Sequence, residues 1–90
     1  MGDYQQARTL HEDTLTRYRR LLGDDHPDTL STADELAFDL HASGNYQQAY
    51  ALHADTLTRR RRVLGNEHPH TLQSAKNLAA ELQELGEPPQ

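Results

Sequence analysis

The sequence predicts an all-α protein in which antiparallel helical hairpins stack side by side as a short α-solenoid. The first observation is an internal repeat: aligning residues 2–43 with residues 44–85 gives about 24 identical pairs, and a fixed period of this size is typical of stacked repeats. The second is helical periodicity, with apolar residues on one face before Gly44 and on one face after it. Because two apolar faces joined by so short a turn must close on each other, this pattern predicts an αα-hairpin.

The first helix is expected over residues 4–22, where arginines crowd the last turns and suit the negative end of the helix dipole. Gly23 should end this helix, and Pro27 suits the first turn of the next one. The second helix is therefore expected over residues 27–43. Its inner face is marked by apolar residues at helical spacing: Leu30, Ala33, Leu36, Ala37 and Leu40.

The second half of the chain copies the first half. Gly44 can take the left-handed conformation that ends a helix, and Asn45 can cap the start of the next helix. We therefore expect a third helix over residues 46–64, a fourth over residues 69–85, and a tail over residues 86–90 that cannot continue a helix. Because ninety residues make one domain at most, residues 1–90 are interpreted as a single helical repeat domain.

The pattern Leu-Gly-x-x-His-Pro occurs at residues 22–27 and again at residues 64–69, and a second pattern of small and apolar residues surrounds Gly44. Together these two motifs resemble the tetratricopeptide repeat (TPR), in the long 42-residue form found in kinesin light chains, whose linker has the first pattern. The chain departs from the short form at Thr14 and Thr56, where a small Ala is usual, and at residues 87–89, where another helix would start. The family's core pattern is filled by Leu36, Ala37, Leu40, Gly44, Tyr46 and Ala49.

The resemblance implies a short TPR α-solenoid whose four helices follow the order B-A-B-A. Only residues 28–64 then form one complete A-B unit. We interpret the chain as an excerpt from a longer array, and a short natural protein is the alternative.

In this family the A helices line a concave groove with positions that look away from helix B. Asn and Lys at such positions often hold the backbone or carboxylate of a peptide, which here points to Lys76 and Asn77, whereas their counterparts Asp34 and Glu35 are acidic. Phe38 is a candidate anchor for a ligand side chain. The alternative is that all of these residues form a solvated helix face. Carried over residue by residue, the candidate groove residues are Ser31, Asp34, Glu35, Phe38, His41, Gln73, Lys76, Asn77, Ala80 and Gln83.

Two other groups of residues were considered as sites. The arginine run 59–62 could bind phosphate or nucleic acid, but four consecutive helical residues point in four directions. We favour the interpretation that these arginines pair with acidic neighbours. Six histidines invite a metal site, but no partners at ligand spacing complete one, so structural roles are expected and no metal is assigned.

Composition and missing motifs narrow the function. The absence of cysteine excludes disulfides and thiolate metal sites, and a net charge of −5 argues against general nucleic-acid binding. We find no nucleophile motif, phosphate loop, long apolar run or signal peptide, and therefore expect a cytoplasmic non-enzyme without a cofactor or membrane segment. The leading hypothesis is a scaffold that binds a peptide or partner protein through the helix-A groove. The alternative is a structural element that self-associates, most simply as a dimer, through uncapped end helices.

Overall fold

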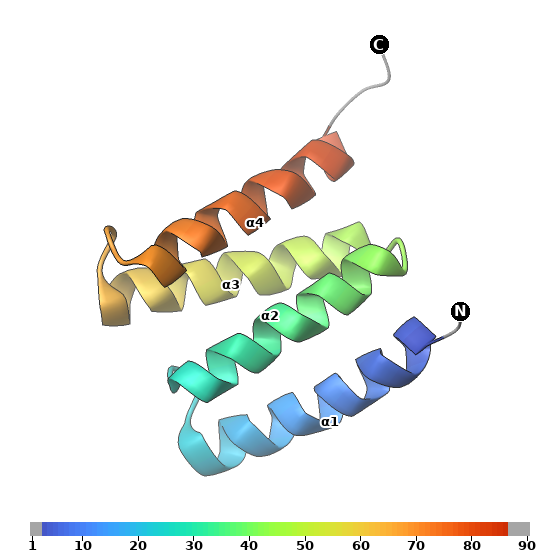
Figure 1. The fold of residues 1–90 in the computed structure, drawn as a ribbon, viewed down its shortest axis with the longest axis horizontal. Coiled ribbons are helices and arrows are strands. Elements are labelled where there is room, and N and C mark those ends of the chain that lie inside the picture. Colours follow the sequence, from blue (N-terminus) through green and yellow to red (C-terminus); the bar gives the residue numbers. More distant parts are fainter. Residues whose placement is uncertain (1–2, 87–90) are drawn as a thin grey trace.

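The computed structural model describes residues 3–86, which form four α-helices joined by short turns (Figure 1). The helices are α1 (Asp3–Leu22), α2 (Pro27–Ala42), α3 (Tyr46–Leu64) and α4 (Pro69–Gly86). This confirms the predicted all-α fold, and each helix ends within one residue of its expected bounds. The prediction that the tail begins at Gly86 is wrong, because Gly86 lacks the positive φ of the three turn glycines and continues α4. The rest of the expected tail, residues 87–90, lies outside the described residues.

The turn between α2 and α3 ends one helix and starts the next within three residues. Gly44 has a φ of +84°, the left-handed conformation that the sequence predicted for it. The Gly44 N–H donates to the His41 carbonyl, and the Asn45 N–H donates to the Leu40 carbonyl at 2.7 Å. These two bonds satisfy the last carbonyls of α2 in the pattern of a Schellman motif. The Asn45 side chain makes no capping hydrogen bond, contrary to the prediction; its backbone carbonyl instead accepts from the Ala49 N–H.

Histidines cap the two helices that follow the long linkers. The Nδ1 atom of His26 accepts a hydrogen bond from the Asp28 backbone N–H at 3.1 Å, and Nδ1 of His68 accepts one from the His70 N–H at 3.0 Å. In both linkers the next residue is proline, whose missing N–H costs nothing at the first position of a helix. The repeated His-Pro pair therefore sets the starts of α2 and α4.

Consecutive helices pack against each other as one thin layer, α1 on α2, α2 on α3 and α3 on α4, with overall dimensions of 42 × 32 × 16 Å (Figure 1). Ala49 has no exposed surface and lies among Leu15, Ala33, Leu36 and Leu40 in the core. A small side chain at this position lets α3 approach α2 closely. None of the helices in residues 3–86 combines the length and apolarity needed to cross a membrane.

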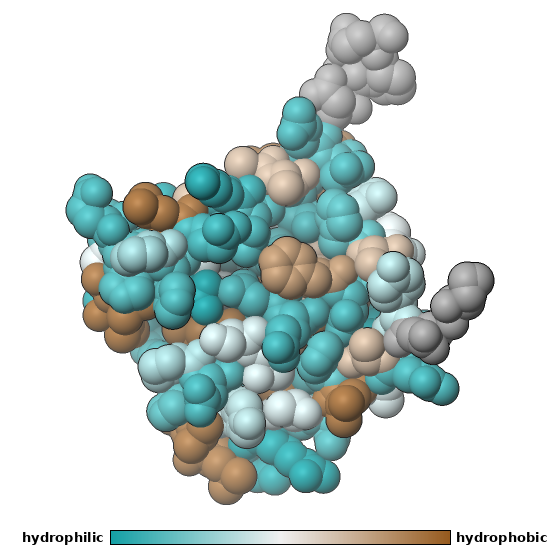
Figure 2. All heavy atoms as spheres, viewed as in Figure 1, coloured by the Kyte–Doolittle hydropathy of each residue, from teal (hydrophilic) through white to brown (hydrophobic). Residues whose placement is uncertain are grey.

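Large apolar side chains remain exposed on the two end helices. Leu10 and Leu21 of α1 are 63% and 72% exposed, and Leu72 and Leu82 of α4 are about half exposed. On the face drawn in Figure 2, the apolar atoms form separate patches, several of them at the outer edge. Within residues 3–86, α1 and α4 therefore each lack a neighbouring helix on one side.

Candidate functional site

A hollow of about 150 Å³ opens where α2 and α4 approach each other across α3. It is lined by residues from all three helices: Phe38, His41, His53, Asn77, Ala80 and Glu81. Four of the predicted groove residues therefore meet in one place: Phe38, His41, Asn77 and Ala80. The exposed ring of Phe38 packs edge-on against the buried ring of His53, with their centroids 5.6 Å apart.

Glu81 is the charged member of this hollow, and sequence reasoning missed it. It is only 2% exposed, and His41 Nδ1 lies 2.8 Å from its Oε2 and 3.0 Å from its Oε1, which joins α4 to α2. A signal was available, because the repeat counterpart of Glu81 is Asp39, also acidic. Asp39 in turn pairs with His11 of α1. Each of these two carboxylates is therefore paired with a histidine from an earlier helix.

A second buried pair lies under the groove. Arg60 of α3 is 5% exposed, and its Nη1 donates to Asp34 Oδ2 at 2.7 Å and to Ser74 Oγ at 2.9 Å. Asp34 therefore does not look away from helix B, as its groove position implied, but pairs with α3. The reason is that burying the Arg60 guanidinium requires a carboxylate partner, and Asp34 supplies it.

His53 lies between the partly buried carboxylate of Asp34 and the buried carboxylate of Glu81. Its Nδ1 is 3.7 Å from Asp34 Oδ1, and its Nε2 is 3.7 Å from Glu81 Oε2, beyond hydrogen-bonding distance in both cases. Both ring nitrogens and Asp34 Oδ1 are buried without a hydrogen-bond partner. Few buried polar atoms stay unpaired in folded proteins, so this ring marks the floor of the hollow as a place for polar contacts.

The other predicted groove residues lie outside this hollow. Ser31 lines a different cavity, of about 220 Å³, beside the α1–α2 and α3–α4 turns. Glu35 is exposed and its Oε1 lies 3.5 Å from His11 Nε2, so it faces α1. Gln73 donates from its side-chain amide to Asn77 Oδ1 at 3.0 Å, whereas Lys76 and Gln83 are exposed on α4.

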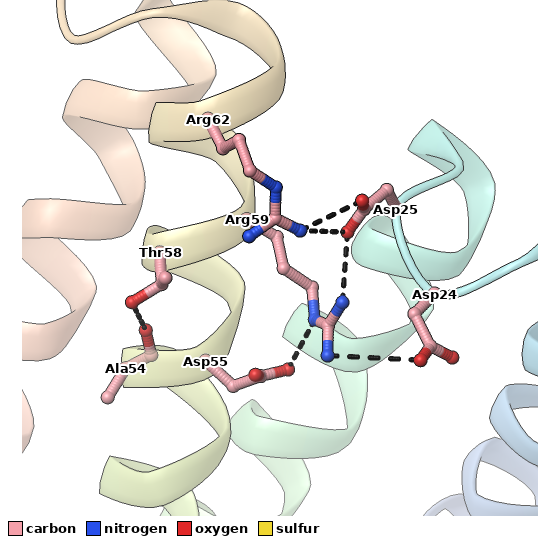
Figure 3. Close-up of polar contacts among 7 residues, drawn as sticks. All are labelled: Asp24, Asp25, Ala54, Asp55, Thr58, Arg59 and Arg62. Atoms are coloured by element: carbon pink, nitrogen blue, oxygen red, sulfur yellow. Dashed lines mark hydrogen bonds and ion pairs between the residues drawn. The ribbon is translucent and has the colours of Figure 1, made fainter.

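The sequence predicted that the four arginines at residues 59–62 point in different directions, and in the structure they do not form one patch. Arg59 lies between Asp55 of its own helix and the turn residues Asp24 and Asp25, and Arg62 also pairs with Asp25 at 2.9 Å (Figure 3). These hydrogen bonds, first from Arg62 and then from Arg59, hold the pKa of Asp25 below its ordinary value. The hydrogen bond from Arg59 to Asp55, followed by the one to Asp25, raises the pKa of Arg59. Arg59 and Arg62 thus tie the α1–α2 turn to α3.

Metal ligation finds no support in the part of the chain that the structure describes. Among residues 3–86, no group of three or more histidine and acidic side chains is arranged to hold a metal ion. Four of the histidines have structural roles. His26 and His68 cap helices, and His11 and His41 pair with carboxylates.

Comparison with known protein families identifies a family that the chain matches. A sequence model described as "Tetratricopeptide repeat" matches residues 1–49 and again residues 31–90, so the two matches together span the chain. No curated protein matches the chain.

Proposed function

Because the chain belongs to the tetratricopeptide repeat family, whose members generally mediate protein–protein interaction, we propose that it is a scaffold that binds a peptide or partner protein along α2 and α4. The observation that carries the proposal is the hollow shared by Phe38 and His41 of α2 with Asn77 and Ala80 of α4. It combines an exposed aromatic ring with an amide and an imidazole. An apolar surface with a few placed polar groups is typical of ligand sites.

The shape of the molecule favours binding over catalysis. A layer 16 Å thick has no deep interior, and the hollow is smaller than the roughly 300–1,000 Å³ typical of small-molecule sites. TPR proteins are typically scaffolds without catalytic activity, and we infer the same for this chain. We also propose that it acts in the cytoplasm.

The test starts from peptides selected against the chain. A phage-displayed library of random dodecapeptides supplies binders, and one synthetic binder is then titrated by fluorescence anisotropy against the parent chain and single variants. Asn77→Ala should weaken binding severalfold because Asn77 lines the hollow, and Lys76→Ala should do so because Lys76 is exposed next to it along α4. Arg61→Ala is the matched control, since it also removes one exposed cation, but from the end of α3.

The expected result is weaker binding by both α4 variants and parental affinity for the control. Equal affinity for the parent, Lys76→Ala and Asn77→Ala would exclude this groove. A library that yields no specific binder would remove peptide recognition altogether.

A second candidate function is self-association, and repeat-equivalent residues favour it. Leu40 of α2 is 5% exposed, whereas its counterpart Leu82 of α4 is 50% exposed; Leu30 is 4% exposed and its counterpart Leu72 is 49% exposed. The apolar face that α3 covers on α2 is therefore open on α4. Fully burying a leucine contributes about 1.5–3 kcal/mol, and covering one that is half exposed contributes about half as much, so several such residues together can drive association.

The chain itself carries a helix suited to that open face. α1 is the repeat counterpart of α3, and α3 packs on α2, the counterpart of α4. By the same pairing, α1 of a second copy can pack on α4. Reciprocal pairing closes a two-fold dimer, which we propose as the assembled form, and one-way pairing would extend as a filament.

A further inference from the structure

The hollow between α2 and α4 has one charged group to offer a ligand. Of its six lining residues, Glu81 is the sole acidic one and none is lysine or arginine. The nearest buried cation, Arg60, already donates to Asp34 and Ser74. The hollow therefore holds one carboxylate, which His41 Nδ1 contacts at 2.8 Å, and no lysine or arginine side chain, in a poorly solvated place.

The unpartnered ring of His53 adds a possible acceptor beside this carboxylate. Its Nδ1 lies 3.7 Å from Asp34 Oδ1 and its Nε2 lies 3.7 Å from Glu81 Oε2, and neither nitrogen has a hydrogen-bond partner within residues 3–86. In the tautomer that carries its proton on Nδ1, Nε2 is a free acceptor on the Glu81 side. The 1% exposure of His53 makes an unmet acceptor here costly, and a ligand donor would relieve that cost.

Three acceptors thus surround one small space beneath an exposed aromatic ring. They are His53 Nε2, the Glu81 carboxylate and Asn77 Oδ1, which takes one hydrogen bond from Gln73 and keeps a second lone pair. A primary ammonium group has three donors and one positive charge, and the aromatic ring of Phe38, a side chain of the kind that attracts cations, lines the same hollow. A carboxylate in the same place would be repelled by Glu81.

We propose that this hollow binds a primary ammonium group of the partner, carried either by a lysine side chain or by a peptide N-terminus. The proposal rests on the proposed function and narrows it, because it names the chemistry that the groove recognises. It also reverses the charge preference suggested by Lys76 and Asn77 alone, which pointed to a carboxylate. A volume of about 150 Å³ accepts the end of one side chain and excludes a larger ligand.

The sequence provides a built-in reporter for a binding test, because Phe38 is the only phenylalanine in the chain. A chain labelled with fluorophenylalanine gives one fluorine resonance at the hollow. The first arm titrates N-acetyl-lysine amide against N-acetyl-norleucine amide, which has the same apolar stem without the charge. A second arm uses norleucine amide, whose free α-amine imitates a peptide N-terminus.

The labelled chain without substitutions should bind at least one of the two amines about tenfold more tightly than N-acetyl-norleucine amide. This is the size of effect expected for hydrogen bonds to a charged group. The arm that responds identifies which carrier the hollow accepts. An equal response to charged and neutral probes would overturn the proposal. This comparison needs no substitution, so it stands even if a variant fails to fold.

The variant arm assigns the effect to Glu81. Glu81→Gln keeps the shape of the side chain and removes its charge, and it should reduce amine affinity about tenfold. Glu84→Gln removes an exposed carboxylate three residues away on the same helix and should leave affinity unchanged. Retained amine binding in a folded Glu81→Gln chain would overturn the proposal while leaving the library-selected peptides, and so the proposed function, intact.

Discussion

Ala49 packs where α3 crosses α2, with no exposed surface and four apolar neighbours in the core. The family pattern predicted a small residue at this position, and the packing gives the reason, because any larger side chain would push the helices apart. At the scale of single residues, core packing was the most predictable property of the chain. The contacts of the buried polar residues, such as Arg60 and Glu81, were far less predictable.

Ala49→Leu should lower the free energy of unfolding by about 1–3 kcal/mol, because added methyl groups overpack a closed crossing. For a domain of this size each kcal/mol corresponds to about 4–8 °C in Tm, which a thermal melt followed by circular dichroism resolves. Ala51→Leu is the control, since Ala51 is exposed on the same helix. An unchanged melt for Ala49→Leu would remove this placement.

Thr56 has a buried hydroxyl that makes no hydrogen bond. Thr56→Val keeps the branched shape and removes the unpaired oxygen, so it should leave stability unchanged or raise it by up to about 1 kcal/mol. The matched variant is Thr32→Val, because the Thr32 hydroxyl is also buried but donates to the Asp28 carbonyl at 2.9 Å. Urea unfolding should show Thr32→Val to be the less stable of the two, and the opposite order would contradict the assignment.

Two residues of the candidate site show where sequence reasoning stops. Arg60 stands within a run of four arginines, and only its direction on α3 makes it a buried partner of Asp34. Glu81 is one of two glutamates on α4 and no local pattern separates it from Glu84, yet it is buried against His41. Helical periodicity predicts which residues share a face, but the meeting of α2 with α4 depends on how successive hairpins stack, which no local pattern encodes.

At the scale of elements, the helices and turns could be predicted nearly completely. Glycine turns, His-Pro linkers and apolar spacing repeat in both halves of the chain, and all act within a few residues. The tie between the α1–α2 turn and α3 could be predicted only in part. The sequence predicted that the arginines pair with acidic neighbours, but it did not indicate that Arg59 would reach Asp25, 34 residues away along the chain.

Asp25→Asn tests that tie through its pH dependence. Because the pKa of Asp25 is lower in the folded chain than in the unfolded chain, its charge stabilises the fold at neutral pH. This stabilisation is complete above about pH 4, the ordinary pKa of an aspartate, and is lost as the pH falls through the lower folded pKa. The urea midpoints of parent and variant should therefore differ slightly at pH 7 and converge in acid.

A double-mutant cycle with Arg62→Gln provides the control for this pair. If the two side chains interact, Arg62→Gln should add little destabilisation to a chain that already carries Asp25→Asn. High salt should shrink the effect, because both groups are partly exposed and salt screens such charges. Fully additive effects, or a difference between parent and Asp25→Asn that persists in acid, would contradict the tie.

At the scale of the whole molecule, we propose that the open faces of α1 and α4 cause the chain to self-associate. Sedimentation velocity over a range of concentrations should show the average mass rising from monomer towards dimer, because α4 exposes the face that α3 covers on α2. Leu82→Glu should abolish that rise by placing a charge on the open face of α4. A constant monomer mass up to high micromolar concentration would exclude self-association.

The control for this prediction is Val63→Glu. Val63 is 48% exposed, much like Leu82, but it lies on the inner helix α3. It should therefore leave the association of the parent chain intact. Loss of association in both variants would point to a general effect of added charge instead of contact through the end helices.

Backbone amide chemical-shift mapping tests most directly the proposal that partners bind along α2 and α4. The isotope-labelled chain is titrated with a library-selected peptide below the concentration at which the chain associates. The shifts should gather around Phe38, His41, Asn77 and Ala80, the residues that meet in the hollow. Shifts confined to the arginine-bearing ends of α1 and α3, with none around the hollow, would contradict the proposed scaffold groove.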